Sequence, residues 1–186
     1  FGLRTIGVVR GEMPEPLNPV LSFAREKGMS LLPVSRDDYR RKQEPDFLEE
    51  LRVRVGDFHL LPEGGNNSLA IKGCEEIASL LKWQNVGSKQ LVALCCGTGT
   101  TMAGLIKGLS IIESKSAPEV LGISVLKGDG YLQAEILGQL QASGCTDPIS
   151  WRVDDAHHCG GYARSNSALQ SFLDEFAGFS DLPLEP

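Results

Sequence analysis

Five small residues, Gly97-Thr98-Gly99-Thr100-Thr101, interrupt the apolar run between Leu91 and Leu109. The residues before this turn are predicted to form a strand, and those after it a helix. At such a junction the backbone N–H groups of the helix N-terminus converge on one point and favour an anion. Glycine lets the backbone approach a ligand closely, and threonine hydroxyls add donors without a formal charge. The turn therefore predicts a binding site for a phosphate monoester.

Two common anion-binding loops differ from this turn. A Walker loop ends in Gly-Lys-Ser/Thr, but the first lysine after the turn is Lys107, which excludes that route to ATP or GTP. The dinucleotide pattern G-x-G-x-x-G requires glycine where Met102 stands, and Asp129 follows the next predicted strand only after a gap. A nucleotide or methyl-donor domain of Rossmann type stays open as an alternative, as does a tight turn that binds nothing.

A second glycine-rich segment lies one predicted unit upstream, in the sequence PEGGNNSLAIKG. It places Gly64-Gly65 and Asn66-Asn67 just before a predicted helix. Asn67 or Ser68 can cap that helix, which would explain the polar residues without a ligand. A cap explains the glycine pair less well. Two such loops in consecutive units are predicted to face one cleft.

The elements that must position these loops alternate along the chain between short apolar runs and segments of helical period. The predicted strands are Thr5–Val9, Ser30–Val34, Phe58–Leu61, Gln90–Cys96, Val120–Val125 and Ile149–Val153. The predicted helices are Pro19–Lys27, Asp46–Arg54, Ser68–Lys82, Thr101–Leu109, Tyr131–Ser143 and Ser167–Phe176, and Ser35–Pro45 is predicted to be a polar connection. This alternation predicts an α/β fold with a mostly parallel sheet, right-handed crossovers, and ligands at the carboxyl ends of the strands.

Composition narrows the functional classes. The 186 residues carry a net charge of −6, and the densest basic cluster, Arg36 to Lys42, is interrupted by two aspartates, so nucleic acid is not predicted as a partner. No apolar run is long enough for a membrane span. Five cysteines without a C-x-x-C pair suit reduced thiols and predict a cytoplasmic location. The adjacent Cys95 and Cys96 are expected to be buried strand residues.

No metal site is predicted. The segment DDAHHCGG gathers acids, histidines and a cysteine, but His157 and His158 are adjacent. In an extended strand, adjacent side chains point to opposite faces, so these two would not share one ion. The segment is expected to form a loop that leads to Tyr162.

The two glycine-rich motifs together resemble those of a known family. PEGGNNSLAIKG followed by ALCCGTGTTMAGL is similar to fold-type II pyridoxal-phosphate enzymes of the tryptophan synthase β group, specifically D-cysteine desulfhydrases and 1-aminocyclopropane-1-carboxylate deaminases. TIGVVRGE, VLGISV and GGYARSN…LEP also occur in the order of that family, so the resemblance spans the sequence. It implies a three-layer fold with residues 1–50 as the remainder of a small cofactor domain and residues 51–186 as most of a large domain.

The resemblance also implies roles for individual residues. Gly97, Thr98, Gly99, Thr100 and Thr101 would hold the phosphate of pyridoxal 5′-phosphate, Asn66 and Asn67 would lie on the substrate side, and Tyr162 would take part in proton transfer. The alternative for Tyr162 is a partly buried core tyrosine with a paired hydroxyl.

The activity implied is that of a lyase or deaminase acting on a small amino acid and releasing ammonia and a 2-oxo acid, in a homodimer by analogy. Ring opening and β-elimination both stay open. Such chemistry needs a lysine that forms an imine with the cofactor. No lysine of this sequence stands in the asparagine-lysine context of the family, so the sequence is expected to be an internal section that is inactive by itself. A binding module that has lost catalysis is the remaining alternative.

Overall fold

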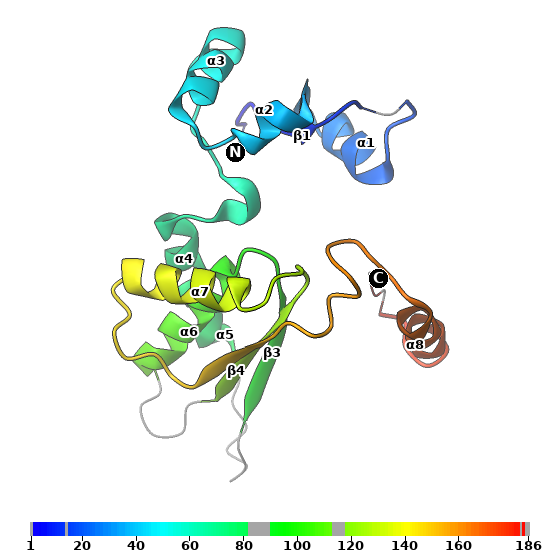
Figure 1. Ribbon diagram of the computed structural model, residues 1–186. Helices are drawn as coiled ribbons and strands as arrows, with labels where there is room; N and C mark the ends of the chain where they lie inside the picture. Colours follow the sequence, from blue (N-terminus) through cyan, green and yellow to red (C-terminus); the bar gives the residue numbers. More distant parts are fainter. Residues whose placement is uncertain (1, 14, 82–89, 113–117, 183, 185–186) are drawn as a thin grey trace. The chain divides into compact units, whose positions relative to one another are not determined.

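The computed structural model describes residues 2–13, 15–81, 90–112, 118–182 and 184. The chain divides into two compact units, Phe1–Leu60 and Leu61–Pro186, and each is considered by itself. Figure 1 shows the elements of both units. Among the described residues, no helix has the length and apolar character needed to cross a membrane. The predicted boundary near residue 50 separates a small cofactor domain from a large domain of the whole enzyme that the resemblance implies. It is not the same division as these two compact units, and it stays a prediction.

The first unit is built around two parallel strands, in which Ile6 of one lies opposite Ser30 of the other. Its elements are β1 (Ile6–Arg10), α1 (Pro19–Glu26), β2 (Ser30–Val34), α2 (Arg36–Arg40) and α3 (Pro45–Val55). The predicted helix Pro19–Lys27 corresponds to α1: the Asn18 side chain accepts a hydrogen bond from the Leu21 N–H at 2.9 Å at its start, and Gly28 with φ 90° follows its end. The unit has a small core of Val34, Phe47 and Leu51.

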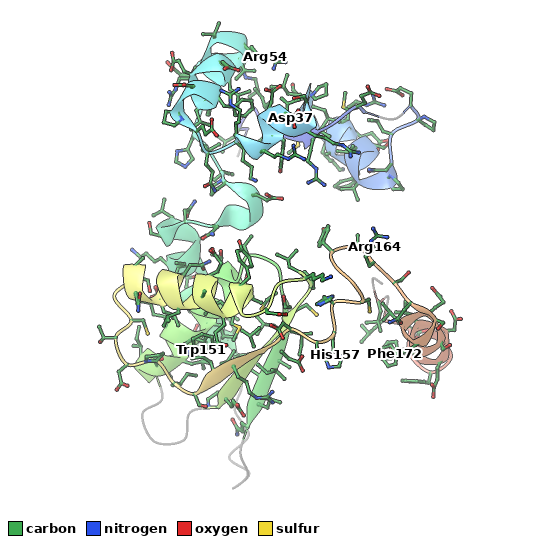
Figure 2. The ribbon with its side chains drawn as sticks, in the orientation of Figure 1. Asp37, Arg54, Trp151, His157, Arg164 and Phe172 are labelled. Atoms are coloured by element: carbon green, nitrogen blue, oxygen red, sulfur yellow. The ribbon has the colours of Figure 1, made fainter. Side chains whose placement is uncertain are left out.

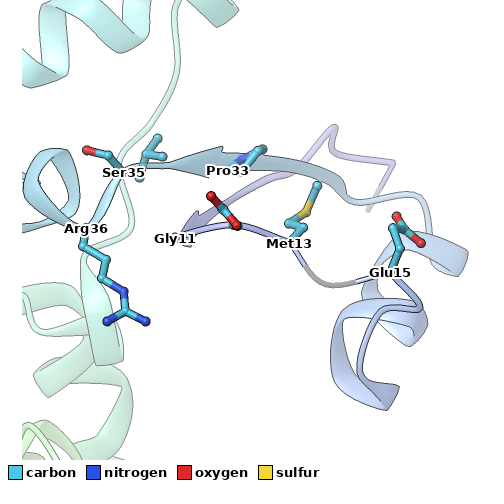
Figure 3. Close-up of a pocket in the computed structure, with 8 residues that line it drawn as sticks. Gly11, Met13, Glu15, Pro33, Ser35 and Arg36 are labelled. Atoms are coloured by element: carbon cyan, nitrogen blue, oxygen red, sulfur yellow. The ribbon is translucent and has the colours of Figure 1, made fainter.

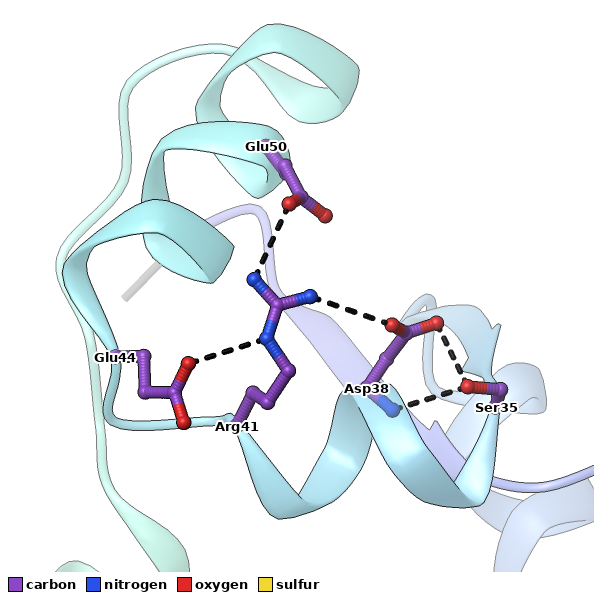
Figure 4. A network of polar contacts seen from close by, with 5 residues as sticks. All are labelled: Ser35, Asp38, Arg41, Glu44 and Glu50. Carbon is purple, nitrogen blue, oxygen red and sulfur yellow. Dashed lines mark hydrogen bonds and ion pairs between the residues drawn. The ribbon is translucent and has the colours of Figure 1, made fainter.

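The short helix α2 lies in the segment that the sequence predicts to be a connection, so that prediction is wrong there. The Ser35 hydroxyl accepts a hydrogen bond from the Asp38 N–H at 3.0 Å and so caps the helix. Arg41 follows it and pairs with Asp38 at 3.7 Å, Glu44 at 3.1 Å and Glu50 at 3.4 Å (Figure 4). Apart from Tyr39, which packs against the core, α2 is held by local polar contacts, so its five residues show no hydrophobic period.

The apolar run Phe58–Leu61 forms no strand, contrary to the prediction. In the described part of the chain no neighbouring strand pairs with it, and an unpaired strand leaves its backbone groups without partners. Phe58 packs against the core of the first unit, while Leu61 is 73% exposed. The apolar residues of this run therefore pack in part against a core without joining a sheet.

The second unit contains a parallel sheet in the order β3-β4-β5, with Leu91 opposite Glu119 and Val120 opposite Trp151. Its strands are β3 (Leu91–Cys96), β4 (Glu119–Ser124) and β5 (Trp151–Asp154). Its helices are α4 (Ser68–Glu75), α5 (Ile77–Leu80), α6 (Thr100–Ile112), α7 (Tyr131–Ala142) and α8 (Ser167–Ala177). The predicted helix Ser68–Lys82 is thus interrupted, and its last residue lies outside the described residues. The predicted α/β class with parallel strands and flanking helices is confirmed.

One face of this sheet carries the helices. Sequential parallel strands with right-handed crossovers place both connecting helices, α6 and α7, on the same face, and Figure 1 shows α4 to α7 gathered there. Along β4 the alternate residues Val120, Gly122 and Ser124 are buried, while Leu121 and Ile123 on the other face are partly exposed. The core therefore lies between the sheet and the helices.

Two glycines let α4 and α6 pack at backbone distance. A Cβ atom at Gly104 would lie 2.4 Å from Cys74 Cβ and 2.6 Å from the Ile71 carbonyl oxygen, and one at Gly108 would lie 2.4 Å from the Glu75 carbonyl oxygen. Real Cβ atoms do not approach so closely. The half-buried ion pair from Glu75 Oε1 to Lys107 Nζ, 2.8 Å long, joins the same two helices.

The two adjacent thiols differ in exposure, which corrects the expectation that both are buried. Cys96 is 4% exposed and packs in the core, whereas Cys95 is exposed on the opposite face of β3. Successive residues of a strand point to opposite faces, and only one face of this sheet is covered by α6 and α7.

We expect Cys96 to make stability fall at alkaline pH. Burial, with a smaller contribution from the neighbouring Cys95, raises the pKa of the Cys96 thiol to about 11. An exposed thiol in the unfolded chain titrates near a pKa of about 8.5. The contribution of the buried thiol to the free energy of unfolding is therefore fully present below about pH 8.5. It is lost as pH rises toward 11, because the unfolded chain releases the proton first. Urea unfolding of wild type and Cys96→Ala between pH 7.5 and 11 measures this loss as the difference between the two free energies of unfolding. If both free energies change with pH in the same way, the prediction is wrong.

Candidate functional site

The glycine-rich turn follows β3 and opens α6, as the sequence predicts. Gly99 has φ 78°, a conformation that favours glycine. The Ala103 N–H donates to the Gly99 carbonyl at 2.9 Å and makes the first hydrogen bond of the helix. The N–H groups of Thr100 and Thr101 precede that bond, so they have no partner within the helix. These donors lie at the positive end of a helix 13 residues long.

The threonine hydroxyls of the turn are arranged as a pair. Thr98 Oγ1 and Thr100 Oγ1 are 3.3 Å apart, within hydrogen-bond reach of each other. Thr100 is only 5% exposed, Thr98 is partly buried, and Thr101 is exposed. In such a pair one hydroxyl donates to the other, which can then donate outward. The turn can thus offer hydroxyl as well as backbone donors without any charged side chain.

The second glycine-rich segment contacts the turn. It forms a short 3₁₀ helix, Glu63–Gly65, in which Gly64 has φ 66°. A Cβ atom at Gly64 would lie 2.5 Å from Thr98 Cγ2 and 2.6 Å from Thr98 Oγ1, so only glycine fits there. The structure therefore brings together the two loops that were predicted to face one cleft.

Asn66 and Asn67 follow this contact and start α4. Asn67 Oδ1 accepts a hydrogen bond from the Ala70 N–H at 2.8 Å, so the capping interpretation holds for Asn67. Both asparagines are partly buried. Their role on a substrate side stays a prediction.

Helix α7 packs directly beneath the turn, which the sequence did not indicate. A Cβ atom at Gly99 would lie 2.6 Å from Ile136 Cγ1 and 3.2 Å from Leu132 Cδ1. One further turn along the same helix, Gln139 Nε2 donates to the Thr98 carbonyl oxygen at 2.8 Å. These three side chains are spaced by four and three residues and share one helix face. The turn is thus held on α7, and with Gly64 it forms what we call the cradle, defined by residues 97–101, Gly64 and Gln139.

The loops after β4 and β5 meet near the same end of the sheet. The Gly130 N–H donates to Asp155 Oδ2 at 3.1 Å, and a Cβ atom at Gly161 would lie 4.0 Å from Lys127 Cβ. Tyr162, which comes next, is 73% exposed. The alternative of a partly buried core tyrosine is therefore wrong, whereas a role in proton transfer stays a prediction.

The histidine-rich segment between β5 and Tyr162 is a loop, as expected. Asp154 Oδ2 lies 3.4 Å from His157 Nε2, and His158 Nδ1 accepts a hydrogen bond from the Gly160 N–H at 2.9 Å. Figure 2 shows His157 in the segment that leaves the sheet. Within the described residues, no three His, Cys, Asp or Glu side chains gather as a metal ion would require.

A separate pocket lies in the first unit, at the carboxyl ends of β1 and β2 (Figure 3). The pocket is lined by two carboxylates, a guanidinium group and uncharged residues, namely Gly11, Glu12, Met13, Glu15, Pro33, Val34, Ser35 and Arg36. This mixture of charges does not indicate one class of ligand. The cradle differs, because its neutral hydrogen-bond donors indicate an anion as the ligand.

Comparison with solved structures identifies the fold. A crystal structure of a homologue of 1-aminocyclopropane-1-carboxylate (ACC) deaminase matches the whole chain with a TM-score of 0.77 at 22% sequence identity, over 57% of its own chain. The chain therefore has the α/β fold of that protein. No protein-family model matches the sequence.

Comparison of sequences points the same way. The chain is 28% identical, over its whole length, to a protein of Thermotoga maritima that is provisionally named 1-aminocyclopropane-1-carboxylate deaminase. The chain spans 61% of the length of that relative. These two likenesses confirm the resemblance to 1-aminocyclopropane-1-carboxylate deaminases that the glycine-rich motifs indicate.

Proposed function

We propose that this chain carries, in its cradle, the phosphate-binding site of a pyridoxal-phosphate-dependent deaminase or lyase that acts on a small amino acid. The observation that carries the proposal is the turn at residues 97–101, which presents the N-terminus of α6 and is fixed between Gly64 and α7. The neutral donors and glycine walls of the cradle fit a phosphate monoester. The names of the similar proteins favour a deaminase over a desulfhydrase.

Each group of the chain has a defined task in this proposal. The N–H groups of Thr100 and Thr101 and the paired hydroxyls of Thr98 and Thr100 would bind the phosphate and orient the molecule that carries it. Pyridoxal phosphate, when bound, supplies an electron sink for negative charge next to an amino group. Tyr162 would hold or move a proton at its phenol oxygen. The products would be ammonia and a 2-oxo acid, and a cytoplasmic homodimer is proposed by analogy alone.

Gly97→Asp provides the sharpest test of the cradle. A Cβ atom at Gly97 meets nothing within 4 Å, so this position accepts a side chain without a clash. The added carboxylate lies beside the site for the phosphate and repels it. A like charge about 4 Å away costs on the order of several kcal/mol at a partly shielded site. We therefore expect binding of inorganic phosphate and of pyridoxal phosphate to weaken about 100-fold or more, as measured by isothermal titration calorimetry.

Two matched variants control for shape and for total charge. Gly97→Asn has nearly the shape of the aspartate but no charge, and its affinity is expected to stay within about threefold of wild type. Gly73→Asp adds the same charge at an open position on α4, and it should leave affinity close to that of wild type. Equal affinity of Gly97→Asp and Gly97→Asn would show that phosphate does not bind in this cradle.

A further inference from the structure

Gln139 is a buried polar side chain committed to one backbone group. It is 8% exposed, and its Nε2 donates to the carbonyl oxygen of Thr98, 41 residues away in the sequence. Its Oε1 is buried and has no hydrogen-bond partner among the described residues. An unpaired buried acceptor costs about 1–3 kcal/mol. The hydrogen bond from Gln139 to the Thr98 carbonyl is thus formed although it leaves the Gln139 Oε1 atom buried and unpaired.

The held carbonyl determines where the next N–H group points. Thr98 and Gly99 are joined by a trans peptide, since Glu15-Pro16 is the cis bond found among the residues that the structure describes. In a trans peptide the C=O and N–H bonds point in opposite directions. Because the Thr98 carbonyl is directed at α7, the Gly99 N–H is directed away from α7.

The backbone of the turn does not secure this orientation by itself. Gly99 has φ 78°, and glycine adopts positive and negative φ about equally readily. Rotation of the peptide between Thr98 and Gly99 would present a carbonyl oxygen to the anion in place of an N–H group. Ile136 restricts the space beside the Gly99 Cα atom but offers no hydrogen bond to the peptide. Gln139 supplies that hydrogen bond.

We propose that Gln139 is a positioning residue for the bound phosphate, because its hydrogen bond to the Thr98 carbonyl aims the Gly99 N–H at the anion. This inference rests on the proposed function of the cradle. Gln139 itself does not contact the phosphate in this arrangement. It acts through the Thr98–Gly99 peptide, whose N–H joins those of Thr100 and Thr101 as a third backbone donor.

Gln139→Met tests the inference, because methionine keeps the length of the side chain and removes the donor. The control is Gln133→Met on the exposed face of the same helix. Inorganic phosphate is titrated into the ¹⁵N-labelled chain, and the two HN–Hα coupling constants of Gly99, which report φ, are measured without phosphate. For Gln139→Met we expect about tenfold weaker phosphate binding, altered Gly99 couplings, and an unfolding midpoint within about 3 °C of wild type. Gln133→Met should match wild type in all three.

The outcomes separate this inference from the proposed function. A lower unfolding midpoint with unchanged phosphate affinity and unchanged Gly99 couplings would reduce Gln139 to a structural residue and overturn the inference. If wild type binds no phosphate, the proposed function fails, and unchanged couplings in Gln139→Met would then overturn the inference separately. Should Gln139→Met not fold, Gln139→Leu serves instead, since leucine is also apolar, favours a helix and removes the donor.

Discussion

Replacement of Gly104 by valine is expected to lower the free energy of unfolding of the Leu61–Pro186 unit by about 4 kcal/mol or more. The first added carbon would lie 2.6 Å from the Ile71 carbonyl oxygen and 2.4 Å from Cys74 Cβ. The carbonyl belongs to the backbone of α4, so no side-chain rotation can relieve the overlap. The two helices would have to separate, and the contact between α4 and α6 would be lost.

Urea unfolding followed by circular dichroism measures this effect, with Gly73→Ala as the control. Gly73 lies on α4, and an added Cβ atom there meets nothing within 4 Å. Alanine in a helix interior is favoured over glycine by about 0.5–1 kcal/mol, so this variant should be more stable than wild type. A Gly104→Val protein that unfolds at the same urea concentration as wild type would show that α4 and α6 are further apart than described.

Gly99→Ala should destabilise the cradle by about 2–4 kcal/mol, for two separate reasons. A non-glycine residue at φ 78° is strained by about 1–2 kcal/mol. The added methyl group would also lie 2.6 Å from Ile136 Cγ1, on the side chain of a core residue that is fully buried. Thermal unfolding of the variant measures the sum of the two effects.

A double-mutant cycle with Ile136→Ala separates strain from overlap. Ile136→Ala alone is expected to cost about 2–5 kcal/mol, because it leaves a cavity in the core. In the double variant the methyl group at position 99 occupies part of that cavity. The double variant should therefore be more stable than additivity predicts, by about 1 kcal/mol or more. Strict additivity would mean that Gly99 does not pack against Ile136 and that backbone strain alone limits position 99.

The fold of the second unit could be read from the sequence because its elements follow strong local patterns. The runs before and after the turn fill β3 and the buried helix α6, and the turn residues themselves mark the boundary between them. Gly144 follows α7 with φ 78°, the left-handed conformation that glycine favours after a helix. In these segments hydrophobic period, glycine position and tertiary packing agree.

The errors arise where local pattern and tertiary environment diverge. Phe58–Leu61 is apolar enough for a strand but has no strand to pair with in the described part of the chain. Helix α2 is too short and polar to show a period, and charged side chains around Arg41 stabilise it instead. Cys95 resembles Cys96 in the sequence, yet the open face of the sheet leaves it exposed.

The sequence indicates the turn residues of the candidate site but not the residues that support the turn. The types and spacing of the glycines and threonines in the turn indicate an anion-binding loop from the sequence alone. Gln139 is not indicated in this way, since it is one of several glutamines on α7 and its partner Thr98 is 41 residues away. Only the packing of α7 under the turn distinguishes it from Gln133 and Gln141, which are exposed. A long-range hydrogen bond of this kind has no local signature.

The packing of Gly99 on α7 also has a consequence for the order of events during protein synthesis. The chain leaves the ribosome from its N-terminus, so the turn at residues 97–101 emerges well before Ile136 and Gln139 do. Until those two residues are available, the nascent chain has the complete glycine-rich motif without the surface that shapes it. The motif is five residues long, but a translated segment that contains every residue of the cradle must extend at least from Gly64 to Gln139.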